Sequence, residues 1–236
     1  MKKLILGATG AIGSALAKKI AADGGQVHLV ARDESSLSDL ASELNASFTT
    51  CDVLEDNFSE KILSDLGDAP IDGLAYCVGS IDLKPLKLSK KNDFLNCFNL
   101  NLISATEIIR ASFNKLKENK GSIVLFSTVA ARKGFTNHSI ISSAKAAVEG
   151  LTVALAAEFS PSVRVNCIAP SLSKSKMGEF LLKNEKIAEG IAKLHPLKRL
   201  GEGSDFSSIA KFLISDESSW ITGQIIGVDG GRSSIA

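Results

Sequence analysis

The chain has 236 residues, of which 44% are hydrophobic and 22% charged, so it can bury a sizeable core without disulfide or metal staples. This composition excludes disordered and fibrous proteins. The 27 basic and 26 acidic residues are spread along the chain and leave a net charge of +1, which argues against nucleic acid or an anionic membrane as a partner.

The cysteines indicate a reduced, cytoplasmic protein. None of them forms a Cys-x-x-Cys pair, and three lie in apolar runs that are typical of buried strands. They are Cys51, Cys77, Cys97 and Cys167. The apolar run near the start ends at Gly7, and no long apolar stretch follows, so we expect neither a signal peptide nor a membrane span. No metal site is expected.

Short apolar runs alternate with longer segments of helical period. The expected strands are Leu4–Leu6, Val27–Ala31, Ser47–Thr50, Gly73–Cys77, Ile123–Phe126, Val163–Ile168 and Ile225–Val228. The expected helices are Ala11–Asp23, Ser35–Leu44, Ser89–Leu116, His138–Phe159 and Asp205–Ile214. Nearly unbroken apolar strands are typical of a parallel sheet covered by helices on both faces. The pattern predicts a doubly wound α/β fold of the Rossmann type, with residues 1–236 forming one domain.

A glycine-rich loop follows the first expected strand. Glycines between a strand and a helix allow a tight turn and let the backbone approach a pyrophosphate, whose charge then lies at the helix N-terminus. A glycine-rich turn without a ligand is the alternative, and the position of the loop at the start of a strand-helix-strand unit argues against it. The expected pyrophosphate-binding residues are Gly7, Thr9, Gly10, Ala11, Ile12 and Gly13.

The end of the second strand predicts the preferred cofactor. A carboxylate at this position would bond a 2′-hydroxyl and repel a 2′-phosphate, whereas the chain has Ala31 followed by Arg32. A guanidinium makes charge-assisted hydrogen bonds to phosphate, so we expect NADP(H), with NAD(H) as the second choice. Asp33 either offsets this charge or caps the next helix, and Arg32 as an ordinary surface charge is the plain alternative.

The stretch from Ser171 to Pro196 is the least patterned part of the chain. We interpret it as a mobile flap over a substrate cleft, since long insertions near the carboxyl ends of strands hold substrate loops. An ordinary amphipathic surface helix is the alternative. Lysines surround an apolar set in this stretch, and the residues concerned are Lys174, Lys176, Met177, Phe180, Leu181, Lys183 and Lys186.

Further motifs follow the glycine loop in a fixed order. They are Cys51-Asp52-Val53, Leu100-Asn101-Leu102, the strand from Gly121 to Thr128, the run from Ser143 to Ala147 around Lys145, the segment from Arg164 to Pro170, and Thr222-Gly223-Gln224 with Val228-Asp229-Gly230-Gly231. With these motifs the chain resembles the short-chain dehydrogenase/reductase family over nearly its whole length.

The resemblance implies a seven-stranded single domain that transfers hydride between a nicotinamide cofactor and a carbonyl or alcohol. It also implies a homodimer or homotetramer with a small-molecule substrate. Asn101, Thr128 and Lys145 would be catalytic, with Thr128 at the family's serine position. The further cofactor contacts would be Asp52, Val53, Cys77, Val78, Gly79, Lys145, Pro170, Ser173 and Ser175.

The chain departs from the family at the proton donor. The family signature is Tyr-x-x-x-Lys, and counting back four residues from Lys145 gives Ile141, which can neither donate nor accept a proton. The chain has a single tyrosine, Tyr76, so no local shift supplies the phenol. Milder departures are Tyr76-Cys77-Val78-Gly79 in place of Asn-Asn-Ala-Gly, and Pro170-Ser171 in place of Pro-Gly.

Three replacements for the phenol remain open. Lys145 could act as the acid if burial lowers its pKa, His138 could relay a proton from one helical turn before Ile141, and Tyr76 could move in from its strand. His28 and His195 are expected to be structural or exposed. The main hypothesis is an NADP(H)-dependent oxidoreductase with altered proton-donor chemistry. The rivals are a cofactor-binding sensor without turnover and an isomerase or dehydratase.

Overall fold

A parallel seven-stranded sheet forms the centre of the computed structural model, which describes residues 1–175, 178 and 184–235. The strand order in this part of the chain is β3-β2-β1-β4-β5-β6-β7. The strands are β1 (Lys2–Leu6), β2 (Gln26–Ala31), β3 (Ser47–Thr50), β4 (Ile71–Tyr76), β5 (Ser122–Phe126), β6 (Arg164–Pro170) and β7 (Ile225–Val228). The predicted α/β fold is confirmed, and each expected strand forms with ends within two residues of the prediction.

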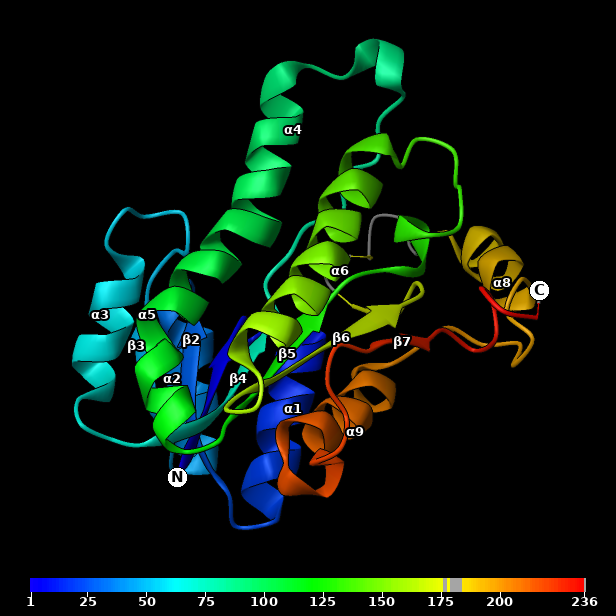
Figure 1. Cartoon of the computed structure of the whole chain (residues 1–236). Coiled ribbons are helices and arrows are strands. Elements are labelled where there is room, and N and C mark those ends of the chain that lie inside the picture. The colour runs from blue at the N-terminus through cyan, green and yellow to red at the C-terminus, as the bar shows by residue number, and fades with distance from the viewer. Residues whose placement is uncertain (176–177, 179–183, 236) are drawn as a thin grey trace.

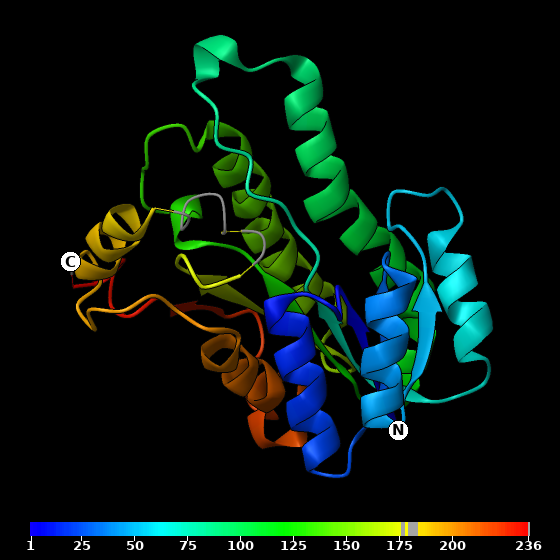
Figure 2. The ribbon, with the colours of Figure 1, turned by 180° about the vertical axis from the view of Figure 1, so that it is seen from behind.

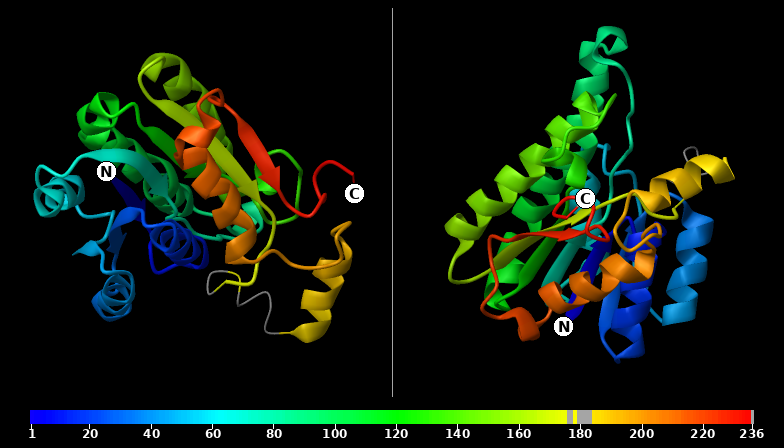
Figure 3. Two further views of the ribbon diagram at one scale, coloured as in Figure 1. Left: turned by 90° about the horizontal axis from the view of Figure 1, so that it is seen from below. Right: turned by 90° about the vertical axis from the view of Figure 1, so that its right-hand side faces the viewer.

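Helices cover both faces of the sheet (Figure 1, Figure 3). They are α1 (Ala11–Ala22), α2 (Glu34–Leu44), α3 (Phe58–Leu66), α4 (Lys91–Phe98), α5 (Ser104–Glu118), α6 (Ser139–Phe159), α8 (Glu185–Lys193) and α9 (Gly203–Ile214). Figure 2 shows α1, α2 and α9 in front of one face. Helices α3, α5 and α6 pack on the other face, so a separate apolar core lies on each side of the sheet.

Alternation along the strands divides the side chains between these two cores. Leu4 and Leu6 of β1 lie in the core under α3, α5 and α6, whereas Ile5 lies in the core under α1, α2 and α9. Successive strand residues point to opposite faces, and both faces are covered. This is why the strands appear in the sequence as unbroken apolar runs.

The structure differs from the predicted helices in two places. Helix α3 was not predicted, although Phe58, Ile62 and Leu66 recur every fourth residue and are buried. The single helix expected from Ser89 to Leu116 is divided, because a π-helical turn, Asn99–Ile103, separates α4 from α5. Such turns free backbone groups from the regular helical ladder and are frequent at functional sites.

The sheet has its switch point between β1 and β4. Consecutive strands run outward from β1 to β3, and the chain then returns to place β4 on the other side of β1. In open parallel sheets, ligands bind outside the carboxyl ends of the strands at this point. The glycine loop after β1 and residues 77–79 after β4 meet there, since the amide of Cys77 donates to the carbonyl of Leu6 at 2.9 Å.

The motif on β6 has a structural role. The Arg164 guanidinium donates to the carbonyl oxygens of Leu213 and Ser215 at 3.1 and 2.8 Å. Asn166 donates to the carbonyl of Ile221 at 2.9 Å and accepts from the amide of Gln224 at 3.1 Å. Both residues therefore fasten β6 to the segment between α9 and β7.

Helix α6 is long and apolar enough, by length and composition alone, to cross a bilayer. It packs on β6, and its buried residues include Lys145 and Glu149. Buried charged groups with polar partners on the inward side are a feature of a core helix. We therefore interpret α6 as part of the core that carries the candidate site.

Candidate functional site

The glycine loop brings three backbone segments together where side chains would not fit. Gly7 has φ of +76°, and a Cβ at this position would lie 2.9 Å from the carbonyl carbon and oxygen of Cys77. A Cβ on Gly13 would lie 2.3 Å from the carbonyl oxygen of Gly7. Gly10 is the N-cap of α1 and provides no side-chain cap. The first amides of α1, from Ala11 to Gly13, therefore form an N-terminus suited to a phosphate.

Arg32 and Asp33 have different roles at the end of β2. The Asp33 carboxylate caps α2 by accepting from the amide of Ser36 at 2.8 Å. The Arg32 side chain is 74% exposed, and its Nη1 lies 3.5 Å from Oδ2 of Asp52. An exposed ion pair at this distance is weak. The guanidinium is therefore available to an anionic ligand, while the neighbouring carboxylate is directed to the helix start.

Two of the expected cofactor contacts, Asp52 and Val53, lie close to Arg32 in the chain's fold. The amide of Cys51 donates to the carbonyl of Ala31 at 3.1 Å, which extends the pairing of β2 and β3 by one step. Asp52 accepts from the amide of Leu54 at 3.1 Å, and Val53 is buried. The segment is thus held beside the end of β2.

Asn101 lies on the π-helical turn and is oriented toward Gly79. Its Nδ2 donates to the carbonyl of Cys97 at 2.8 Å and to Oγ of Ser80 at 3.4 Å, so both acceptors fix the orientation of the amide. Its Oδ1 is buried and has no hydrogen-bond partner among the described residues. Buried acceptors are nearly always bonded, so this oxygen indicates a place for a donor.

Lys145 converges on the same place. A Cβ on Gly79 would lie 3.0 Å from Asn101 Oδ1 and 3.2 Å from Lys145 Nζ, so the missing side chain leaves room between these atoms. The Lys145 side chain is buried and donates to the carbonyl of Phe126 at 2.8 Å. Burial lowers the pKa of Lys145 to about 8, although nearby thiols oppose this shift. A lysine with this pKa can exchange protons near neutral pH.

Thr128 is held at the start of the loop after β5. Its hydroxyl donates to the carbonyl of Pro170 at 3.4 Å and accepts from the amide of Ala130 at 3.3 Å. The preceding Ser127 donates to the buried carboxylate of Glu149 at 2.9 Å, and Arg132 donates to the same carboxylate at 2.6 Å. This network connects the Thr128 loop to α6, four residues beyond Lys145.

Ile141 lies in an apolar cluster and not in a polar environment. It is buried with Ile140, Ala144 and Cys97, and three partly buried side chains, Leu83, Phe94 and Phe98, pack against this cluster. The aliphatic residue at the family's tyrosine position is therefore well packed. Nothing in this cluster, apart from the thiol, can donate a proton.

Tyr76 has a structural contact in place of a position beside Lys145, which argues against it as the replacement for the missing phenol. The side chain is 2% exposed, and its hydroxyl donates to the carbonyl of Leu100 at 2.7 Å. Burial raises the pKa of Tyr76 far above its usual value. The carbonyl that it binds belongs to the π-helical turn, so Tyr76 stabilises the turn that carries Asn101.

Replacing Tyr76 by Phe should lower the free energy of unfolding by about 0.5 to 1.5 kcal/mol, because it removes the hydrogen bond to the Leu100 carbonyl. The pH dependence of any turnover should keep its shape, since burial raises the pKa of the Tyr76 phenol far above neutral pH. Chemical denaturation and pH-rate profiles check both statements. A pH profile that loses one limb in Tyr76→Phe would instead make the phenol a proton donor.

The histidines are accounted for without a catalytic contact. His138 is the residue before α6, and its Nδ1 lies 2.7 Å from the carbonyl of Thr136, so this nitrogen carries the proton. In the part of the chain that the structure describes, no hydrogen bond connects it with Lys145. His28 is fully buried between Ser47 and Thr49, and burial lowers its pKa to about 4. Its neutral form is therefore a structural hydrogen-bonding group.

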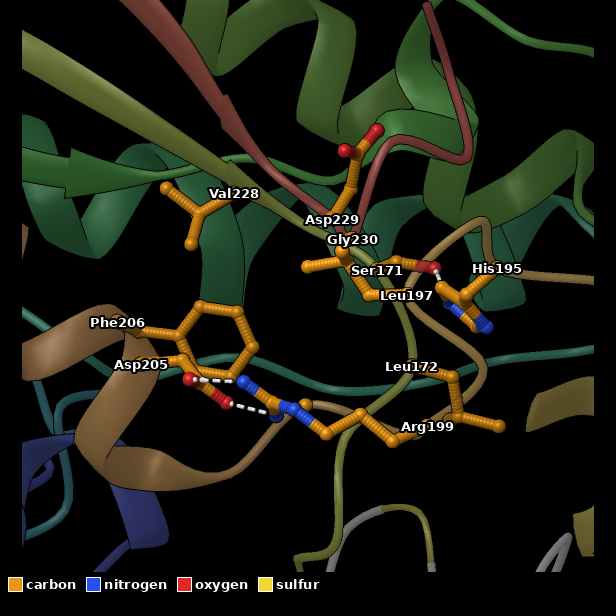
Figure 4. Close-up of a pocket in the computed structure, with 11 residues that line it drawn as sticks. Ser171, Leu172, His195, Leu197, Arg199, Asp205, Phe206, Val228, Asp229 and Gly230 are labelled. Atoms are coloured by element: carbon orange, nitrogen blue, oxygen red, sulfur yellow. Dashed lines mark hydrogen bonds and ion pairs between the residues drawn. The ribbon is translucent and has the colours of Figure 1, made fainter. Parts of the chain in front are cut away.

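A hydrogen bond between Ser171 and His195 connects the two ends of the expected flap. His195 is buried, and its Nδ1 lies 2.9 Å from the carbonyl of Ile191, so Nε2 accepts from the hydroxyl of Ser171 at 2.8 Å (Figure 4). Part of the stretch is helical, as α8 shows. Several residues of the flap prediction lie outside the described residues, namely Lys176, Met177, Phe180, Leu181 and Lys183.

A small cavity of about 100 Å³ lies beside the hydrogen bond between Ser171 and His195. Figure 4 shows Ser171 and His195 on one side and the paired Arg199 and Asp205 on another. None of Asn101, Thr128 and Lys145 lines this cavity, so it lies apart from these three residues.

The expected cofactor contacts after β6 lie near this cavity. Pro170 ends β6, and Ser173 forms a parallel bridge with Gly201. Ser175 accepts from the amide of Gly178 at 3.2 Å.

Comparison with known proteins gives consistent matches. A profile of the family described as enoyl-(acyl carrier protein) reductase matches residues 7–233. A tropinone reductase homologue of Arabidopsis thaliana is 34% identical over 243 residues, covering 99% of this chain and 76% of the relative. The L-xylulose reductase of Bos taurus is 30% identical, covering 98% of this chain and 95% of the relative.

Solved structures match over the whole chain as well. A short chain dehydrogenase/reductase family protein superposes with a TM-score of 0.90 at 27% identity, covering 99% of this chain and 97% of the other. The short-chain dehydrogenase/reductase described as glucose/ribitol dehydrogenase from Brucella melitensis gives a TM-score of 0.92 at 29% identity, with 98% and 96% covered.

Proposed function

The chain belongs to the short-chain dehydrogenase/reductase family, and from that premise we propose that it is an NADP(H)-dependent oxidoreductase for a small carbonyl compound or alcohol. The observation that carries this proposal is that Asn101 Oδ1 and Lys145 Nζ both lie beside Gly79. A buried unpaired acceptor next to a buried cation suits a reacting hydroxyl or a water molecule.

A nicotinamide dinucleotide fits the residues of the glycine loop and those around Gly79. The glycine loop leaves its helix N-terminus uncapped by a side chain, and the room beside Gly79 opens onto Lys145. The amides of residues 11–13 would hold the pyrophosphate, Arg32 the adenosine ribose, and Lys145 with Asn101 the reactive end. When bound, the nicotinamide supplies or accepts a hydride.

Arg32→Ala tests the preference for the 2′-phosphate. We expect this substitution to weaken NADPH binding by about 1 to 3 kcal/mol, or about 5- to 150-fold, because a charge-assisted hydrogen bond is lost. NADH binding should change little, and fluorescence titration measures both constants. Arg110→Ala is a matched control, since Arg110 is an exposed arginine on α5. Equal weakening of both cofactors would contradict the assignment of Arg32.

In this proposal, side chains of the protein orient the substrate and supply the proton. Thr128 provides a hydroxyl that can orient a carbonyl oxygen, and the Glu149 network holds its loop against α6. Lys145 donates the proton that the missing phenol would otherwise supply, because its pKa near 8 allows it to act at neutral pH. Ile141 and the apolar cluster around it lie one helical turn before Lys145, which favours a substrate with an apolar flank.

A binding module without turnover is the second candidate, and the packing of Ile141 in an apolar cluster favours it. Titration with NADPH and NADH, followed by assays with aldehydes, ketones and alcohols, separates the two. Turnover by the native chain supports the oxidoreductase. NADPH binding without turnover of any substrate identifies the sensor, and failure of both nicotinamides to bind rejects the proposal.

A further inference from the structure

A chain of hydrogen bonds joins a lysine to a carboxylate through the buried ring of His28. Lys2 Nζ donates to Oγ of Ser47 at 2.9 Å, and the same oxygen lies 2.9 Å from Nδ1 of His28. On the other side of the ring, Nε2 lies 3.0 Å from Oγ1 of Thr49, which donates to Oδ2 of Asp65 at 2.7 Å. The chain therefore connects β1, β2, β3 and α3, away from the candidate site.

The charges at its two ends fix the direction of every bond in this chain. An ammonium only donates, a carboxylate only accepts, and a hydroxyl has one proton to give. Because Thr49 gives its proton to Asp65, it accepts from the Nε2–H of His28. The bare Nδ1 of the neutral ring then accepts from Ser47, whose oxygen accepts from Lys2. His28 is therefore held as the neutral Nε2–H tautomer.

A second proton on His28 would break this order at Ser47. Its Nδ1–H would donate to an oxygen that already accepts from the Lys2 ammonium, so two cations would face one hydroxyl. Burial, and then the charge of Lys2, lowers the pKa of His28 to about 4, while Asp65 opposes this shift. Among the described residues, Lys2 from β1 and Asp65 from α3 are the charged groups that act on the ring. The ring is therefore neutral at physiological pH.

The chain fastens β3, which ends the strand order of the sheet. This strand pairs with β2, and α3 packs on it (Figure 1). Ser47 and Thr49 both belong to β3, so two of its side chains bond the ring of His28. The strand leads directly into Asp52 and Val53, which are expected cofactor contacts. Edge strands are paired on one side and open locally with little resistance, so the place of Asp52 and Val53 depends on what holds β3.

We propose that His28 is a positioning residue for the adenosine end of the cofactor, because its hydrogen-bond chain holds β3 against β2 and acid releases it. This inference rests on the proposed function for the cofactor. In an opened β3 the ring takes up a proton near its ordinary pKa of about 6.5, whereas in the closed fold it does so near 4. The opened form therefore binds the proton first as the pH falls. The closure of β3 is at full strength above about pH 6.5 and weakens down to about pH 4.

The state of the ring can be measured without any cofactor. Long-range ¹H–¹⁵N NMR spectra distinguish the two neutral tautomers of histidine from the cation. The chain has three histidines, and His138→Gln and His195→Gln identify the other two rings. We expect His28 to be the neutral Nε2–H tautomer at pH 7 and still neutral at pH 5, and Lys2→Met to raise its pKa. An Nδ1–H tautomer, or a ring that titrates near pH 6.5, would overturn the proposal.

Hydrogen exchange of the β3 amides measures the release. Protection factors, which correct for the intrinsic effect of pH on exchange, should fall about tenfold in β3 between pH 7 and pH 5. His28→Gln keeps an N–H donor for Thr49 but does not titrate, so its β3 protection should not fall over this interval. His138→Gln is the matched control and should respond to acid as the native chain does. An equal fall in His28→Gln and the native chain would show that another group releases β3.

Binding of NADP⁺ tests the connection to the cofactor. The 2′-phosphate itself takes up a proton at about pH 6, so the native chain and His28→Gln are compared at the same pH. Between pH 7 and pH 5 the affinity should fall several-fold further in the native chain. An equal loss in both proteins would overturn the positioning role of His28. Failure of NADP⁺ to bind at any pH would reject the proposed function, whereas the NMR and exchange results would still decide whether His28 holds β3.

Discussion

Replacing Lys145 by Met should lower the rate of carbonyl reduction by about 10² to 10⁴, the range for loss of a general acid. The ammonium lies beside Asn101 Oδ1, and the described part of the chain places no phenol there. Steady-state kinetics with saturating NADPH measures the change. NADPH binding should also weaken, because Lys145 is expected to contact the ribose, so the dissociation constant is determined in parallel.

The pH dependence of the native protein provides an independent check. Burial lowers the pKa of Lys145 to about 8, so its ammonium is present below that pH and is lost as the pH rises through it. Reduction should therefore be fast below about pH 8 and decline above it. Alcohol oxidation, which needs the neutral amine, should rise over the same interval.

Lys145→Arg separates proton donation from charge. Arginine remains cationic throughout the working range and cannot give up its proton. This variant should lose the rate as Lys145→Met does, even if NADPH binding is retained. A Lys145→Arg protein with the native rate and no decline above pH 8 would show that Lys145 acts only through its charge.

Replacing Ile141 by Tyr should raise turnover, because it places a phenol one helical turn before Lys145. The gain should be smaller than the factor of about 10² to 10⁴ that a general acid supplies on its own, since Lys145 already donates a proton. The same substitution should also make the protein less stable. Ile141 lies in a packed cluster with Cys97 and Ala144, and a larger side chain there should lower the free energy of unfolding by about 1 to 3 kcal/mol.

Ile141→Phe is the matched control for this gain. It adds nearly the same volume to the cluster without the hydroxyl, so it should share the loss of stability and show no increase in rate. An equal increase in both variants would assign the effect to the shape of the pocket. No increase in Ile141→Tyr, with NADPH still bound, would mean that the proton donor does not limit the native chain.

The sequence by itself determined the architecture and the cofactor loop. Unbroken apolar strands such as Val27–Ala31 are dictated by burial on two faces, which is a local property of composition. The glycines at positions 7, 10 and 13 are likewise a local signal, since their place between a strand and a helix predicts a tight turn. The sequence also shows directly that Ile141, and not a tyrosine, stands four residues before Lys145.

The tertiary structure decided how the site is arranged, because its contacts join residues far apart in the sequence. At the interruption of the long helix, the hydroxyl of Tyr76 donates to the carbonyl of Leu100, 24 positions further along the chain. The pKa of Lys145 depends on burial, which no local pattern reveals. The division of tasks between Arg32 and Asp33 was open until the cap on α2 was seen.

The contact between Asn101 and Ser80 was also decided by the tertiary structure. The π-helical turn carries Asn101, whose Nδ2 donates to the hydroxyl of Ser80 across 21 positions in the sequence. Periodicity and composition describe what each segment buries, whereas the meeting of polar atoms requires the packed fold.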